Sequence, residues 1–139
     1  MKKGFTLIEL LIVVAIIGVL ATLLMSNFVG VRQRGRDAER KSNMRQVQSA
    51  LEMYRADVGS YPVALPSCGS SLQSGNITYM QKVPCDPLNS GSFVLTYTSD
   101  GSVYSLISCL ENVNDSQKDS STDPQCDGTN SWSFTLQNP

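Results

Sequence analysis

The chain has 139 residues, of which 41% are hydrophobic and 17% charged, and its formal net charge is −1. This length suits one small domain, or one small domain with an anchor. The sequence contains no histidine, which removes the commonest general base of enzymes and the commonest zinc ligand of proteins. The charge is unevenly spread: residues 32–58 hold seven basic and four acidic residues, whereas residues 59–139 hold two basic and seven acidic ones.

Residues 5–31 are predicted to form a membrane-spanning helix. The run from Leu10 to Met25 contains nothing more polar than Gly18 and Thr22. Counted from Phe5, its helix would span about 32 Å at ~1.5 Å per residue, enough to cross a hydrocarbon core of ~30 Å. A secretory signal peptide would instead end in a small-residue cleavage site, and the chain offers a poor one. We therefore expect an anchor that is retained.

Glu9 is the only charged residue inside this apolar segment. A carboxylate is costly there, and such residues usually have a partner. No basic residue lies within one helical turn, and Lys3 falls on a different face. We therefore expect the partner to come from another chain, or from a charge that processing creates.

The string Lys3-Gly4-Phe5-Thr6-Leu7-Ile8-Glu9-Leu10 resembles the processing site of type IV prepilins and type II secretion pseudopilins. In that family a membrane peptidase cuts after the glycine and methylates the new terminal amine. The resemblance implies that residues 1–4 are a cleaved leader, that Gly4 and Phe5 flank the cut, and that Phe5 and Glu9 direct assembly. It further implies a homo-oligomeric helical filament, with a prepilin peptidase/methyltransferase and an inner-membrane assembly platform as partners. No cofactor is expected.

Two features of the sequence predict opposite directions of membrane insertion. The six basic residues between Arg32 and Arg45 outweigh Lys2 and Lys3, which by the positive-inside rule places the C-terminus in the cytoplasm. The resemblance implies the opposite, a single pass through the inner membrane with the head outside, followed by incorporation into a pilus or a periplasmic or cell-surface filament. The cysteines of the head also suit an oxidising compartment, so we favour the second orientation.

Residues 32–58 are predicted to continue the same helix in amphipathic form. Apolar residues recur there in steps of 3, 4, 3 and 4, which places them on one face. They are Met44, Val47, Leu51, Tyr54 and Val58. The sequence Gly59-Ser60-Tyr61-Pro62 ends the helix, which we expect to run from about Phe5 to about Val58.

Residues 59–139 are predicted to form a globular head. Residues 63–91 look like a loop with one short apolar piece at 77–80, and alternation predicts a strand over 93–98. A turn at 99–102 leads to a second strand over 103–110, and Trp132, Phe134 and Leu136 mark a third. The expected fold class is α+β, a long helix packed on a small antiparallel sheet, as in pilins.

The four cysteines, Cys68, Cys85, Cys109 and Cys126, all lie in the head at spacings far from a zinc pattern. Two disulfides are favoured over four free thiols, and three pairings are possible. We favour Cys68–Cys85, which closes the loop after the helix. The pair Cys109–Cys126 would then tie the end of the second strand to the approach to the last one.

Two features of the sequence could indicate binding functions, the first of them nucleic-acid binding. The basic residues from Arg32 to Arg45 lack interleaved aromatic residues, and Asp37 and Glu39 dilute them, so nucleic-acid binding is not expected. A solvated or subunit-bridging helix face is favoured instead.

The second binding function is calcium binding by an oxygen-rich loop. Major pseudopilins hold calcium in a C-terminal loop, and residues 112–127 are rich in side-chain oxygens. Those residues are Asn112, Asn114, Asp115, Asp119, Asp123 and Asp127. Their spacing does not match an EF-hand, and a disulfide at Cys126 would hold the loop without metal, so no metal site is expected.

The function expected is that of a structural filament subunit and not an enzyme, because no paired nucleophile and base is present. A type IV pilin is favoured by the two disulfides and the long loop. A major pseudopilin of a type II secretion system is favoured by the motif Val83-Pro84-Cys85-Asp86-Pro87, which resembles that group. A signal-anchored extracytoplasmic binding module is the third alternative.

Overall fold

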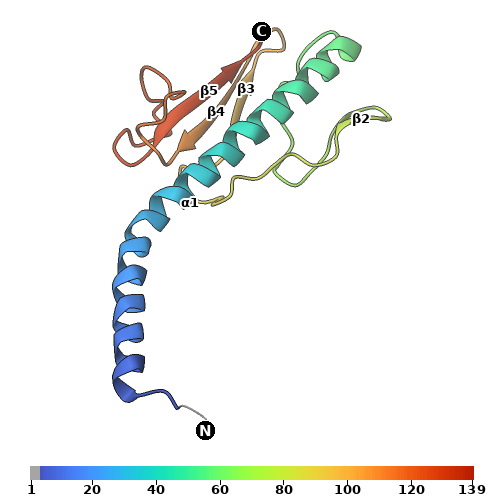
Figure 1. The fold of residues 1–139 in the computed structure, drawn as a ribbon. Helices are drawn as coiled ribbons and strands as arrows, with labels where there is room; N and C mark the ends of the chain where they lie inside the picture. The colour runs from blue at the N-terminus through green and yellow to red at the C-terminus, as the bar shows by residue number, and fades with distance from the viewer. Residues whose placement is uncertain (1–3) are drawn as a thin grey trace. The chain divides into compact units, whose positions relative to one another are not determined.

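A computed structural model describes residues 4–139, apart from the side chains of residues 26 and 27. Most of the expected leader, Met1 to Lys3, therefore lies outside the described residues. The chain forms two compact units, residues 1–33 and 34–139. A single helix, α1 (Leu7–Val58, 52 residues), contributes to both (Figure 1).

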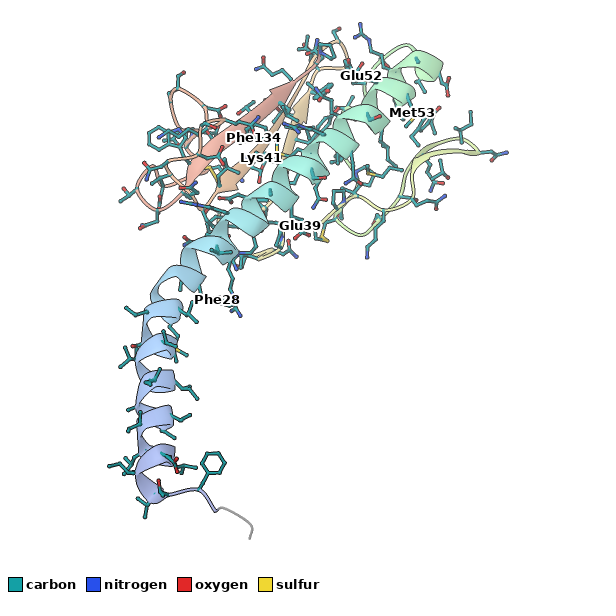
Figure 2. All side chains as sticks on the ribbon, in the orientation of Figure 1. Phe28, Glu39, Lys41, Glu52, Met53 and Phe134 are labelled. Carbon is teal, nitrogen blue, oxygen red and sulfur yellow. A yellow bond between two sulfur atoms is a disulfide. The ribbon has the colours of Figure 1, made fainter. Side chains whose placement is uncertain are left out.

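The first unit consists of the apolar part of α1. Its most hydrophobic 18-residue window has a mean hydropathy of 2.9, and none of that window is buried within the chain. The side chains point outward all round the helix (Figure 2). By length and composition this segment is able to cross a membrane, and its apolar surface requires lipid or other protein chains as partners.

In the second unit, α1 buries the face that its spacing predicts. Met44, Val47 and Leu51 are at most 1% exposed, and Tyr54 is half-buried against the same core. Val58 departs from the prediction, because it is 44% exposed. The helix ends there: Gly59 adopts a φ of +87° and its N–H donates to the carbonyl of Arg55, a helix-ending geometry that glycine adopts without strain.

Three strands form the main sheet, in the order β3-β4-β5, with antiparallel pairing throughout. Their bounds are β3 (Thr96–Ser99), β4 (Tyr104–Leu110) and β5 (Trp132–Gln137). A tight turn between Ser99 and Tyr104, which pair with each other, joins the first two as predicted. The expected fold class, a long helix on a small antiparallel sheet, is confirmed.

A second, two-stranded sheet was not predicted. β1 (Leu72–Ser74) pairs with β2 (Ile77–Met80) through the two-residue turn Gly75–Asn76, within the segment expected to be mostly loop. β1 has three residues and only Leu72 is apolar, so it carries no alternation that a sequence pattern would detect. This hairpin and the main sheet lie on opposite flanks of α1 (Figure 1).

Two tyrosines and one glutamate link the end of α1 to the sheet. The rings of Tyr61 and Tyr104 meet edge to face at 4.7 Å, and both hydroxyls donate to the carboxylate of Glu52, at 2.9 and 3.2 Å. Burial raises the pKa of Tyr104 to about 12, and the negative charge of Glu52 acts in the same direction.

The raised pKa predicts an alkaline loss of stability. Since the folded protein holds the Tyr104 proton more tightly than the unfolded chain does, this contribution is complete below pH ~10 and lost between about pH 10 and 12. We expect it to amount to roughly 3 kcal/mol at ~1.4 kcal/mol per pKa unit. The single tryptophan, Trp132, lies in β5, so its fluorescence reports unfolding of the head in detergent-solubilised full chain. Tyr104→Phe should flatten this part of the pH profile, and an unchanged profile would contradict the assignment.

Candidate processing and assembly site

The peptide bond expected to be cleaved lies outside the helix. Gly4, Phe5 and Thr6 precede α1 without regular structure, and all three are exposed, Phe5 to 88%. A protease needs an extended, accessible backbone, which these residues present.

Thr6 and Glu9 bind each other reciprocally at the start of α1. The backbone N–H and the hydroxyl of Thr6 donate to Glu9 Oε2 at 2.8 and 2.7 Å, and the N–H of Glu9 donates to Thr6 Oγ1 at 3.3 Å. This is a capping box, which satisfies N–H groups that a helix start leaves unpaired, and it explains why α1 begins at Leu7 and not at Phe5.

The capping box changes the expectation that Glu9 finds its partner only outside its own segment. Thr6 supplies hydrogen bonds from within the chain, and as an uncharged residue it was not among the expected partners. It supplies no positive charge, however, so the carboxylate keeps its net charge. The expected role of Phe5 and Glu9 in assembly therefore stays a prediction.

Arg40 forms the centre of a buried charge cluster in the head. It is 2% exposed and contacts three carboxylates. Its Nε and Nη2 donate to the two oxygens of Asp86 at 2.6 and 3.0 Å, and its Nη1 donates to Asp37 and Glu111 at 2.7 and 2.8 Å. Burial alone would disfavour the charged guanidinium, but these carboxylates outweigh it and raise the pKa of Arg40 above its usual range.

Neighbouring residues extend the cluster along α1. Asp37 accepts the backbone N–H groups of Glu111 and Asn112, at 2.9 and 2.8 Å. The Arg36 guanidinium binds Glu111 with two hydrogen bonds and holds the pKa of that carboxyl below its usual value. Lys41 Nζ donates to Asp115 at 2.8 Å.

These contacts correct the expected solvated or subunit-bridging role for three of the basic residues. Arg36, Arg40 and Lys41 instead join α1 to loops of their own head. Their carboxylate partners in the loops lie 46 to 75 residues away in the sequence, so spacing along the helix gives no information about them.

The structure joins Cys68 to Cys85 and Cys109 to Cys126, with Cα–Cα distances of 4.9 and 5.6 Å. This is the pairing that the sequence analysis favours. The second disulfide is buried, whereas Cys68 is exposed. Each bond also fixes a partner of Arg40, because Asp86 follows Cys85 directly and Glu111 lies two residues after Cys109.

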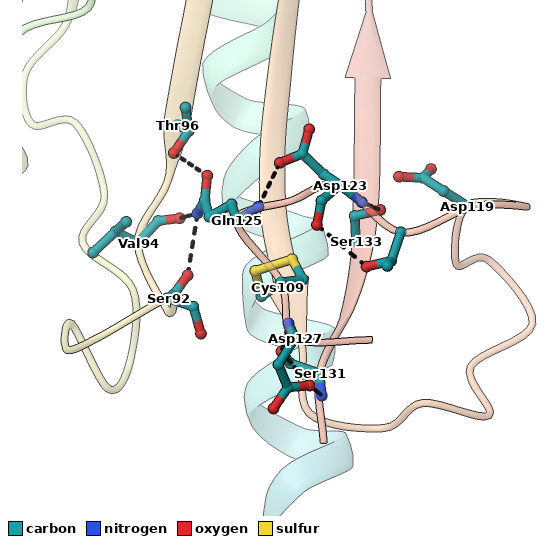
Figure 3. Close-up of a disulfide and its surroundings, with 12 residues drawn as sticks. Ser92, Val94, Thr96, Cys109, Asp119, Asp123, Gln125, Asp127, Ser131 and Ser133 are labelled. Carbon is teal, nitrogen blue, oxygen red and sulfur yellow. Dashed lines mark hydrogen bonds between the residues drawn. A yellow bond between two sulfur atoms is a disulfide. The ribbon is translucent and has the colours of Figure 1, made fainter. Parts of the chain in front are cut away.

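The buried disulfide also positions Gln125, beside Cys126 (Figure 3). Gln125 Nε2 donates to the carbonyls of Ser92 and Val94 at 3.1 and 3.0 Å, and its Oε1 accepts from the hydroxyl of Thr96. In the segment before β3, the Gln125 side chain thus binds backbone carbonyls that a neighbouring strand would otherwise bind. The expected strand over 93–98 accordingly starts only at Thr96.

The two disulfides should differ in their contribution to stability. Each spans 17 residues and is worth ~3 kcal/mol in the chain-entropy model. Removing Cys109 and Cys126 by alanine substitution should cost more than removing Cys68 and Cys85, because it also releases Gln125. Urea unfolding of the full chain in detergent, followed by Trp132 fluorescence, measures both. Equal losses, or a Cys85–Cys109 link in non-reducing peptide maps, would contradict this account.

The acidic residues of the loop 112–127 each make separate local contacts. Asp119 accepts from the N–H and hydroxyl of Thr135, and Asp123 accepts from the N–H of Gln125. The backbone N–H groups of Thr129 and the two following residues hold the pKa of Asp127 well below its usual value. Among residues 4–139, no three acidic or cysteine side chains gather in a way that could hold a metal ion.

We propose that this loop keeps its shape without a cation, through its disulfide and these hydrogen bonds. Calcium binding to the folded state would stabilise it by mass action. We therefore expect the thermal midpoint of the head to stay within 1 °C, roughly the precision of the measurement, whether calcium or a chelator is present. A midpoint that rises with calcium concentration and falls with chelator would contradict the proposal.

Comparison with known proteins gives matches over both parts of the chain. Residues 1–25 match the prokaryotic N-terminal methylation motif, and residues 27–125 match the family of the type II secretion system (T2SS) protein G. The type II secretion system core protein G of Klebsiella pneumoniae is 30% identical over 114 residues, which cover 73% of this chain and 80% of that protein. The Escherichia coli K12 protein of the same description is 28% identical over 117 residues, covering 77% and 80%.

A pilus protein is also similar. The type IV wide pilus major component PilA4 of Thermus thermophilus is 41% identical over 80 residues, covering 55% of this chain and 61% of PilA4. No solved structure matches the chain.

Proposed function

Because the chain belongs to the type II secretion system protein G family, we propose that it is inserted in the inner membrane as a prepilin with its head outside. A prepilin peptidase then cleaves it between Gly4 and Phe5 and methylates Phe5. The mature chain polymerises through its N-terminal helix on an inner-membrane assembly platform. The proteins of this family are structural filament subunits, and homologues serve in type IV pili and in type II secretion.

The observation that carries this proposal is the solvent exposure of the apolar half of α1. A helix that is apolar all round is stable in lipid, or among other helices of the same kind. The window with mean hydropathy 2.9 has no buried part within its own chain. This apolar surface is in contact with lipid while the subunit is in the membrane, and with identical helices once the subunit is in the filament. It is therefore shielded from water both before and after assembly.

Mass spectrometry of the protein in sheared filaments tests the processing step. We expect a chain that begins at methylated Phe5. The Gly4→Arg variant should accumulate as uncut precursor in the membrane, because a long charged side chain replaces the residue before the cut. A mature chain beginning at Thr22, or an intact Met1, would exclude prepilin processing.

Between the two filament types, we propose a type IV pilus. The head closes its long C-terminal loop with the buried Cys109–Cys126 disulfide and with hydrogen bonds of Asp119 and Asp123. A disulfide persists both in the periplasm and outside the cell, so this closure would keep the loop intact in a filament that leaves the cell.

The pseudopilus of a type II secretion system is the second candidate, because the family match and two relatives covered over 80% of their length point to it. Deleting the gene separates the two. Loss of sheared surface filaments with normal release of secreted proteins supports a pilus. Retention of secreted proteins in the periplasm supports a pseudopilus.

A further inference from the structure

We propose that Arg45 of one copy pairs with Glu39 of the next copy across the solvent-facing side of α1, and that this contact sets the axial step of the filament. The inference rests on the proposed filament and specifies one contact in it.

Glu39 and Arg45 are two charged side chains of α1 that the head leaves unused. Both are exposed, and neither has a hydrogen-bonded or ionic partner among the described residues. The intervening Arg40 and Lys41, by contrast, are ion-paired within the head. An exposed carboxylate and an exposed guanidinium are therefore available to a second chain.

The two residues flank one surface of the helix. At about 100° per residue, Arg45 and Glu39 lie ~120° apart around the axis, on either side of the face opposite the buried Met44–Leu51 stripe. Glu39 and Lys41 lie on different sides of α1, Lys41 toward the sheet (Figure 2). Three of the exposed residues between the flanks, Ala38, Ser42 and Ser49, are short, whereas Gln46 and Met53 are longer. The short residues leave room for another chain to approach the helix between its two flanks.

A shallow, open groove of about 550 Å³ lies between α1 and the loop after β4. It is lined by Ala38, Lys41, Ser42, Arg45, Gln46, Ser49 and Gln117. Because Lys41 is already paired with Asp115, Arg45 is the cation of this groove that has no partner among residues 4–139. The groove thus suits an acidic side chain on a neighbouring helix.

Opposite charges on opposite flanks favour a second copy of this chain as the partner. Arg45 on the basic flank of one copy contacts Glu39 on the acidic flank of the next copy. Arg45 of that second copy is then available to contact a third copy. Such a head-to-tail contact does not close on itself and generates a helical array.

The sequence separation then gives the axial step. Arg45 lies six residues beyond Glu39, so the two meet when the next parallel copy is displaced by ~9 Å toward its C-terminus, at ~1.5 Å per residue. Pairing of Glu9 with the Phe5 amine of the next copy requires a displacement of the same sign. Its size is between ~6 Å for a helical segment and ~10 Å for the extended start observed. Each pair, taken within its own unit, therefore needs a displacement of the same sign and of similar size.

Charge reversal in the full chain tests the contact. Glu39→Arg and Arg45→Glu should each lower the yield of sheared filaments at least fivefold, because every contact then sets like charges together. The double reversal should restore at least half of the yield. Arg34→Glu is the matched control: Arg34 is exposed and unpartnered among the described residues, but it lies outside the proposed contact, so its yield should stay normal.

Cysteine cross-linking tests the geometry. In oxidised filaments, Glu39→Cys combined with Arg45→Cys should give a ladder of covalent oligomers, whereas Arg34→Cys with Arg45→Cys, on one flank, should not. Normal yield from either reversal, no recovery in the double variant, or a ladder only in the control pair would overturn the contact. Immunoblots for processed protein distinguish this from failure of the proposed function, in which the unaltered chain forms no filaments.

Discussion

The Glu9→Lys variant should be inserted and cleaved normally, yet should yield less than a tenth of the filaments of the unaltered chain. Cleavage after Gly4 creates an amine on Phe5, which methylation leaves basic. In a core of apolar helices an unpaired carboxylate costs several kcal/mol, and pairing with that amine removes most of the cost. Lysine at position 9 sets two cations together instead. The measurement is the yield of sheared filaments beside an immunoblot of mature protein in the membrane.

Glu9→Gln separates the two roles of this side chain. A glutamine still accepts from the backbone N–H of Thr6, so it keeps the capping box that the structure shows, but it carries no charge. We expect cleavage to proceed and filaments to be few or misassembled. If Glu9→Lys gave normal filament yield, Glu9 would not direct assembly. If Glu9→Gln alone gave normal yield, its hydrogen bonds and not its charge would be what assembly needs.

The features that the sequence predicts well are those encoded locally. The apolar run fixes the first half of α1, and the 3-4 spacing of Met44, Val47 and Leu51 fixes the buried face of its second half. The turn around Gly101 predicts the β3–β4 hairpin, and the alternation of Trp132, Phe134 and Leu136 predicts β5. In each case the pattern lies within one segment and needs no knowledge of distant residues.

The features that were missed depend on distant partners. Asp37 and Arg40 continue the same 3-4 spacing toward the N-terminus, but charged residues are normally solvated, so the stripe was taken to begin at Met44. Their burial depends on Asp86 and Glu111, which the two disulfides hold in place. Gln125 was overlooked for the same reason, because its carbonyl partners lie some 30 residues earlier.

When the 3-4 spacing of apolar helix residues is continued by an acidic and a basic residue, as it is here by Arg40 and Asp37, the pattern therefore indicates a buried ion pair. The signal has physical content, because such residues are almost never fully buried unless paired. In this chain the stripe has a hydrophobic part that drives association of helix and sheet. Its charged part fixes which loops dock on the helix.

Replacing Arg40 by methionine should destabilise the head by about 3–5 kcal/mol, the cost of removing one partner from a buried ion pair. Methionine fills much of the same space, but it leaves Asp37 and Asp86 buried without their cation. Against a total stability of about 5–15 kcal/mol, this loss is large, and at ~1–3 kcal/mol per molar urea it lowers the unfolding midpoint by more than 1 M. Trp132 fluorescence in the detergent-solubilised chain follows the transition.

Arg45→Met is the matched control for that variant, since it removes the same charge from an exposed position without a partner among the described residues. It should change stability by no more than about 0.5 kcal/mol. Adding Asp37→Asn and Asp86→Asn to Arg40→Met should recover part of the loss, because the orphaned charges are then gone. Equal stability of the Arg40→Met and Arg45→Met variants would show that the cluster does not hold the head together. In that case the apolar core and the disulfides alone would position the loops on α1.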